Sequence, residues 1–121
     1  MKESPLHEKS KQFAKRIVRL YHFLRNDKNE FILSKQVVRS GTSIGANISE
    51  SRNAQSTADF VSKLSIALKE ADETHYWIEI LMHGEFISEY QFLSLNNDLK
   101  EIIAMLTSSI KTMRNHENAN S

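Results

Sequence analysis

Glycine and proline, the two residues that most often punctuate turns, are almost absent from this chain. Its 121 residues include three glycines and one proline. A fold built from strands and tight turns needs more of both, so the sequence predicts long, uninterrupted helices. Apolar residues make up 40% of the chain, which is enough for one hydrophobic core at this length. We therefore expect an all-α fold in one domain over residues 1–121.

Hydrophobic periodicity divides the chain into four helical segments. The predicted helices span residues of about 5–26, 34–52, 57–83 and 89–114. Ser4 and Pro5 suit the N-cap and first position of the first helix, and Gly84 suits the C′ position after the third. The polar tail after Arg114 is expected to fray. Helices of this length with short connections pack as an antiparallel, up-down-up-down four-helix bundle.

Two glycines lie on the apolar stripe of the second helix or beside it. Gly41 belongs to the stripe itself, with Val37, Ile44 and Ile48, and Gly45 flanks it. A glycine inside a helix costs about 1 kcal/mol relative to alanine. Two of them four residues apart therefore suggest that the backbone of another helix passes close by.

The third helix carries two apolar faces. One face is the expected core stripe, and the other includes apolar residues on the opposite side. A helix in a lone bundle needs only one such face, and exposed apolar patches usually mark protein interfaces. We therefore predict self-association through the second face. The predicted interface residues are Ile66, Glu73, Tyr76, Trp77 and Ile80.

The middle of the chain resembles a known bacterial family. The stretch VVRSGTSIGANISE, residues 37–50, is similar to a motif of the four-helix-bundle proteins called 23S rRNA-intervening-sequence proteins. The resemblance extends over about residues 13–113. It also includes Phe13-Ala14, Ile17-Val18, Leu20-Tyr21, Asp59-Phe60, Lys63-Leu64, the run ALKEA at 67–71 and the run ETHYW at 73–77.

This resemblance implies an antiparallel four-helix bundle that assembles into a ring-like homopentamer. Some members of the family are encoded inside insertions in large-subunit rRNA genes. A related branch serves diversity-generating retroelements, where a basic pentameric barrel engages a reverse transcriptase and nucleic acid. The net charge of +1 argues against a strongly basic barrel here. The resemblance therefore predicts fold and assembly and leaves the activity open.

Positive charge is concentrated in the first third of the chain. Residues 1–40 contain ten Lys and Arg against four Asp and Glu, whereas residues 41–121 contain six against eleven. Phosphate contacts need only cations gathered on one face, so this segment is the candidate for binding RNA or DNA. The alternatives are a solvated helix face and an adaptor that binds a partner protein. The candidate nucleic-acid residues are Lys11, Lys15, Arg16, Arg19, His22 and Arg25.

A polar line on the second helix has the composition of an active site, but no substrate pocket is apparent beside it. Arg39 can pair with a carboxylate of the third helix, and we interpret the group as a structural network within or between subunits. Its residues are Arg39, Ser43, Asn47, Glu50 and Glu70. Glu70 and Glu73 would suit acid–base chemistry only if they shared a dry cleft.

Other signals of catalysis or metal binding are weak. Asp72 and His75 have the spacing of one helical ligand pair, whereas di-iron bundles need that motif twice and two further glutamates. Arg16 and His22 leave a nuclease as a remote alternative. There is no cysteine. We therefore predict no catalytic site, no metal and no cofactor. Since the N-terminus lacks an apolar signal segment and no apolar run could span a bilayer, we expect a cytoplasmic protein with no membrane contact.

Overall fold

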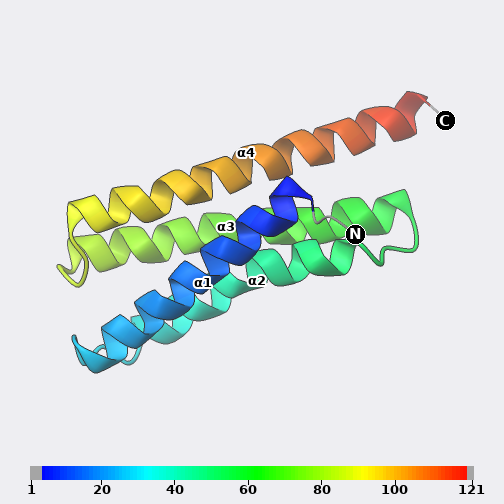
Figure 1. Ribbon diagram of the computed structural model, residues 1–121. Helices are drawn as coiled ribbons and strands as arrows, with labels where there is room; N and C mark the ends of the chain where they lie inside the picture. Colours follow the sequence, from blue (N-terminus) through cyan, green and yellow to red (C-terminus); the bar gives the residue numbers. More distant parts are fainter. Residues whose placement is uncertain (1–3, 120–121) are drawn as a thin grey trace.

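The computed structural model describes residues 4–119, which form four helices with short connections (Figure 1). Helix α1 spans Pro5–Asn26, α2 spans Leu33–Ser51, α3 spans Thr57–His83 and α4 spans Glu89–Ala119. Each helix packs against the next in sequence, and a sparser seam between α1 and α4 closes the bundle. The all-α, up-down-up-down four-helix bundle predicted from the sequence is confirmed.

Serine side chains cap three of the four helix starts. Ser4 Oγ accepts a hydrogen bond from the backbone N–H of His7, the third residue of α1, and Ser56 Oγ accepts one from Asp59, the third residue of α3. Before α4, Ser88 and Gln91 cap each other, because each side chain accepts from the backbone N–H of the other. These contacts satisfy N–H groups that have no partner within their own helix.

A buried carboxylate starts α2. Glu30, which is 9% exposed, accepts hydrogen bonds from the backbone N–H groups of Ile32, Leu33 and Ser34 at 3.2, 3.0 and 2.7 Å. The preceding Asn29 has a φ of 53°, a left-handed conformation that turns the chain out of α1. The helix therefore begins at Leu33 and takes its cap from a glutamate that the sequence patterns did not identify.

The end of α3 differs from the prediction that Gly84 occupies C′. Gly84 has a φ of −80° and remains right-handed, whereas Glu85 has a φ of 66°. The N–H groups of Glu85 and Phe86 bind the carbonyls of Met82 and Leu81, each at 2.9 Å. This is the Schellman arrangement with Glu85 at C′, so the left-handed position falls one residue later than glycine placement suggested.

The predicted end of α4 at about Arg114 is also wrong. The helix continues to Ala119, so its last turns run past the first turn of α1 in Figure 1. No glycine or proline interrupts this segment, and its side chains are mostly exposed. Residues 120 and 121, the rest of the predicted tail, lie outside the described residues.

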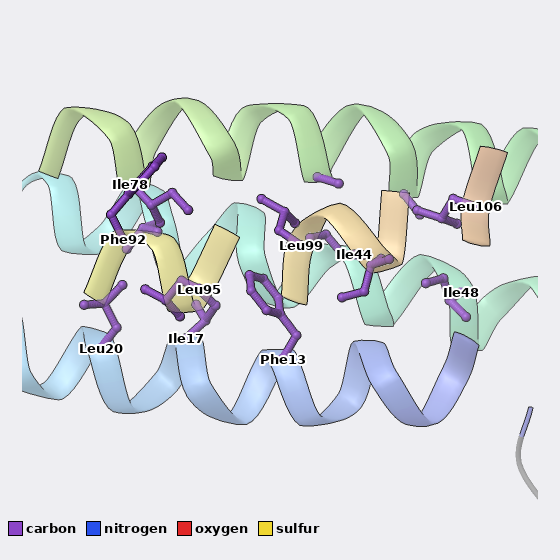
Figure 2. Close-up of a cluster of buried hydrophobic side chains, with 14 of the residues drawn as sticks. Phe13, Ile17, Leu20, Ile44, Ile48, Ile78, Phe92, Leu95, Leu99 and Leu106 are labelled. Atoms are coloured by element: carbon purple, nitrogen blue, oxygen red, sulfur yellow. The ribbon is translucent and has the colours of Figure 1, made fainter. Parts of the chain in front are cut away.

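All four helices contribute to one apolar core, which Figure 2 shows between them. The predicted stripe of α2 is buried in full, including Gly41. Thr74 and Leu81 of α3 are fully buried as well. Thr74 satisfies its hydroxyl by donating to the Glu70 carbonyl at 2.7 Å, and the Ser40 hydroxyl of α2 lies 3.0 Å away.

The two glycines of α2 face α1 at close range, but in different ways. A Cβ on Gly41 would lie 2.8 Å from both Cγ atoms of Ile17, so this glycine accommodates a side chain and not a backbone. A Cβ on Gly45 would lie 3.4 Å from the Ser10 carbonyl oxygen, so here the α1 backbone does approach. The predicted close backbone approach is therefore found at Gly45.

This difference predicts opposite effects for two alanine substitutions. Gly41→Ala should lower the free energy of unfolding by about 1–2 kcal/mol, since the overpacking against Ile17 exceeds the gain in helix propensity. Gly45→Ala makes an ordinary contact and should raise it by up to about 1 kcal/mol. Urea denaturation of both variants measures the change. A Gly41→Ala protein as stable as the wild type would contradict this packing.

Candidate functional site

The cations of α1 fall into two groups according to what they contact. Lys9 and Arg16 face α4, where both pair with Asp98, whose Oδ1 is 3.6 Å from Lys9 Nζ and whose Oδ2 is 2.7 Å from Arg16 Nη1. The other lysines and arginines of α1, apart from the partly buried Arg25, are exposed, and so is His22. We call this second group the basic face of α1. It comprises Lys11, Lys15, Arg19 and His22.

Arg16 therefore contributes to the α1–α4 seam and does not belong to the basic face. The sequence patterns placed it among the candidate nucleic-acid residues. Its guanidinium also donates to the carbonyl oxygen and hydroxyl of Ser94, at 3.2 and 2.8 Å. Lys9 is held beside it, and its hydrogen bond to Glu101 raises the pKa of the Lys9 ammonium. These contacts tie α1 to α4, the pair of neighbouring helices that packs least closely.

Arg25 is also engaged within the protein. Its guanidinium carbon lies 5.2 Å from the ring centroid of Tyr21 and 4.9 Å from that of Phe31, which are cation–π distances. One of its terminal nitrogens is buried. Arg25 therefore packs the α1–α2 connection, which leaves Lys11, Lys15, Arg19 and His22 as the exposed members of the predicted nucleic-acid group.

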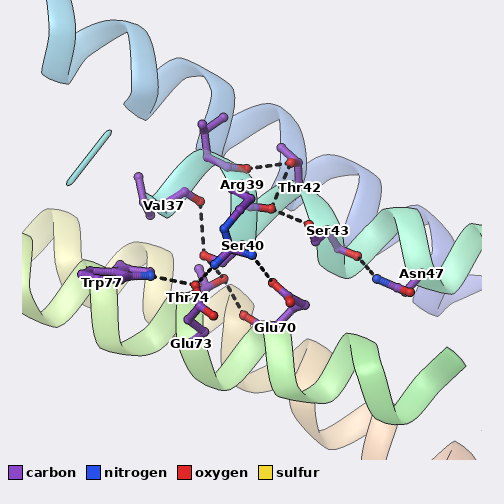
Figure 3. Close-up of polar contacts among 11 residues, drawn as sticks. Val37, Arg39, Ser40, Thr42, Ser43, Asn47, Glu70, Glu73, Thr74 and Trp77 are labelled. Atoms are coloured by element: carbon purple, nitrogen blue, oxygen red, sulfur yellow. Dashed lines mark hydrogen bonds and ion pairs between the residues drawn. The ribbon is translucent and has the colours of Figure 1, made fainter. Parts of the chain in front are cut away.

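Arg39 joins α2 to α3 on the opposite side of the bundle, as Figure 3 shows. Its guanidinium pairs with Glu70, at 3.3 Å, and with Glu73. Glu73 also accepts a hydrogen bond from Trp77 Nε1 at 2.9 Å. Arg39 is half exposed, so the cluster is an interhelix ion-pair network at the surface and has no dry cleft for acid–base chemistry.

The other members of the predicted polar network lie apart from this cluster. Ser43 Oγ donates to the Arg39 carbonyl, and Asn47 Nδ2 donates to the Ser43 carbonyl, so both side chains bond within α2. Glu50 pairs with Lys63 of α3 at 3.2 Å. Sequence spacing placed these residues on one line, but only Arg39 and Glu70 of the predicted set meet across the helices.

The second apolar face of α3 is only partly exposed. Ile66 and Tyr76 are 40% and 53% exposed, whereas Trp77 and Ile80 are half-buried, and Trp77 packs against the core. The Tyr76 and Trp77 rings form a T-shaped pair with centroids 5.1 Å apart. The exposed part of the predicted interface is therefore centred on Ile66 and Tyr76.

The candidate metal pair does not form a site. His75 Nδ1 is hydrogen-bonded to Asn96 Oδ1 of α4 at 2.8 Å. The carboxylate paired with its Nε2 is that of Glu79, at 3.6 Å, and not that of Asp72. Within residues 4–119, no group of three or more His, Cys, Asp or Glu side chains could hold a metal ion.

The nuclease pair is not assembled in the structure either. Arg16 is bound to α4, whereas the His22 ring packs against Tyr21 with centroids 5.6 Å apart. Six residues of helix separate the two by about 9 Å along the axis. The arrangement does not place Arg16 and His22 at one reacting centre.

The sequence patterns did not reveal a groove of about 310 Å³ between α1 and α4. Its floor includes Leu20, Phe23 and Ile87, and Arg19 and Tyr90 stand at its edges. Tyr90 is 82% exposed, more than any other large hydrophobic side chain among the described residues. The available signal was an aromatic residue on the polar side of α4, away from its apolar stripe.

Comparison with known proteins identifies the family. A family model described as 23S rRNA-intervening sequence protein matches residues 2–108, which is most of the chain. The chain belongs to this family. The resemblance predicted from the sequence motifs is therefore confirmed.

One solved structure is closely similar to this chain. It is the crystal structure of a protein with unknown function from the S23 ribosomal protein family of Bacteroides thetaiotaomicron VPI-5482. The two are 57% identical, with a TM-score of 0.87, over 88% of this chain and 95% of that one. No curated protein matches the sequence. Among residues 4–119, no helix combines the length and apolar character needed to cross a membrane.

In this member of the 23S rRNA-intervening sequence protein family, Arg16→Gln should lower the free energy of unfolding by about 1 kcal/mol. The substitution removes charged hydrogen bonds between α1 and α4, and their partial exposure limits the loss. Arg19→Gln, on the same helix, should change it by less than about 0.5 kcal/mol. Equal effects of the two substitutions in urea denaturation would contradict the distinction between seam and basic face.

Proposed function

We propose that this protein is a non-enzymatic, homo-oligomeric scaffold that binds RNA or DNA through the basic face of α1. Self-association uses the outer surface of α3 around Ile66 and Tyr76. The assembly is the pentamer that the family resemblance implies. The observation that carries the nucleic-acid part is the separation of the α1 cations into a paired and an exposed group.

Two residues of the basic face are available for phosphate. Lys15 and Arg19 are exposed and form no ion pair with any described residue, whereas Arg16 pairs with Asp98 and Lys9 pairs with Asp98 and Glu101. The basic face is continuous over successive turns of one helix, so several phosphates of one strand can be contacted together. Such contacts release counterions and require no base recognition, which suits a general nucleic-acid scaffold.

The outer surface of α3 has the composition of a protein interface. Tyrosine, tryptophan and arginine are the residues that most often dominate binding energy at such surfaces. Here Tyr76 rests on Trp77, whose indole is held by Glu73, and Glu73 is held by Arg39. The aromatic pair is therefore fixed in place before a second copy binds, which reduces the entropy cost of association.

The nucleic-acid proposal predicts salt-sensitive binding to labelled structured RNA. Replacing Lys11, Lys15 and Arg19 together by glutamine should weaken binding about tenfold or more at low salt. The slope of log K against log salt is negative, and its magnitude should decrease by roughly 0.7–0.9 for every phosphate that the variant no longer neutralises. Fluorescence anisotropy over a salt series measures both quantities.

A matched control changes the same charge elsewhere. Lys100, Lys111 and Arg114 are exposed on α4, and their triple glutamine variant should keep most of the affinity and the slope. Equal losses in both triple variants would show a general charge effect and no specific face. Absence of wild-type binding at low salt would favour the protein-binding adaptor. The RNA should stay intact on denaturing gels, and cleavage by pure protein would contradict the non-enzymatic part.

The self-association proposal predicts a smaller particle when the α3 surface is charged. Ile66→Glu combined with Tyr76→Glu places two carboxylates where apolar side chains meet a neighbour, so the mass from analytical ultracentrifugation should fall toward that of the monomer. Tyr90→Glu with Leu93→Glu is the matched control, since both residues are exposed on α4. An unchanged mass in the α3 variant would exclude this surface.

A further inference from the structure

The groove between α1 and α4 borders the basic face directly. Arg19 belongs to both, because it is an exposed cation of α1 and lines the groove. The other groove wall is the first turns of α4, which carry Tyr90, Gln91 and Ser94. A strand held by Lys15 and Arg19 would therefore pass the mouth of this groove.

The charge of the groove favours an anionic occupant. Its lining includes two arginines and no acidic residue. Asp98, the acid nearest to Arg16 in the seam, is already bound by Arg16 and Lys9. Arg19 therefore keeps its full charge at the groove mouth, where it can contact a phosphate.

The remaining surfaces suit a nucleobase. Tyr90 presents a largely exposed ring, and the floor below it is apolar, with Leu20 and Ile87 almost completely buried. Gln91 uses its amide oxygen to accept from Ser88 N–H, which holds the side chain and leaves its amide nitrogen without a partner among the described residues. Aromatic rings and amide donors are the groups that bind unstacked bases in single strands.

We propose that this groove binds one unpaired nucleotide, with its base stacked on Tyr90 and its phosphate held by Arg19. The inference rests on the proposed nucleic-acid function and specifies its substrate as single-stranded or looped nucleic acid. The volume, about 310 Å³, is at the lower limit of small-ligand sites and accommodates a single nucleotide. A base within a duplex cannot enter, since its faces are covered by its neighbours.

The test compares two RNA probes on the full chain. Tyr90→Ala should weaken binding of a single-stranded oligoadenylate roughly 5- to 100-fold, the usual effect of losing one base–aromatic stack. Binding of a fully paired RNA duplex should stay unchanged, and so should the salt slope for both probes, because no cation is removed. Tyr90→Phe should retain the affinity for the single strand, since the ring is kept.

Leu93→Ala is the matched control, because it removes an exposed apolar side chain of α4 that does not line the groove. It should leave the single-strand affinity unchanged. If the wild type binds both probes and Tyr90→Ala loses no more than Leu93→Ala, the nucleotide site is excluded while the basic face stands. If the wild type binds neither probe at low salt, both proposals fail, and the groove must be examined for a protein ligand.

Discussion

The close packing of α1 on α2 governs the arrangement of the rest of the bundle. At Gly41 the absence of a side chain lets Ile17 reach the α2 backbone, and at Gly45 the backbones themselves approach. α1 is thereby drawn toward α2, and its seam with α4 stays sparse. This seam carries the polar contacts of Arg16 and Lys9 with α4, and the groove lies beside it. The groove is thus a consequence of how α1 is anchored.

The same anchoring decides which cations are available to a ligand. With Ile17 directed at α2, the helical period turns Arg16 toward α4 and leaves Lys15 and Arg19 exposed. Asp98 then pairs with Arg16 and Lys9, and Glu101 also pairs with Lys9, in a chain whose net charge is only +1. The small net charge therefore results from positive and negative charges that lie on different parts of the surface, and one face of α1 stays cationic. That separation, and not the overall charge, determines whether phosphate can be bound.

Much of the fold followed from the sequence because helices are specified locally. The Ser4 cap and the apolar period placed α1 correctly, and the apolar period placed α3. The left-handed Glu85 and the continuation to Ala119 depend on backbone contacts that composition does not encode. The candidate site was harder to predict, since charge patterning identified six basic residues without showing which ones have partners. Asp98, eighty-two residues from Arg16, supplies that information only once α1 and α4 are side by side. The role of Tyr90 could not be predicted for the same reason, because the groove beside it forms only when the helices pack together.

The proposed ring imposes one more constraint on the surface. A cyclic pentamer is built from heterologous contacts, so the α3 surface of one copy must meet a different surface on the next. Phe31 and Ile32, at the α1–α2 connection, are 47% and 74% exposed and belong to neither the basic face nor the groove. A neighbour that covers these two side chains leaves the α1–α4 side of every copy open. Each copy then offers one weak phosphate face and one nucleotide groove to the same strand, and the repetition around the ring converts modest single-site affinity into avidity.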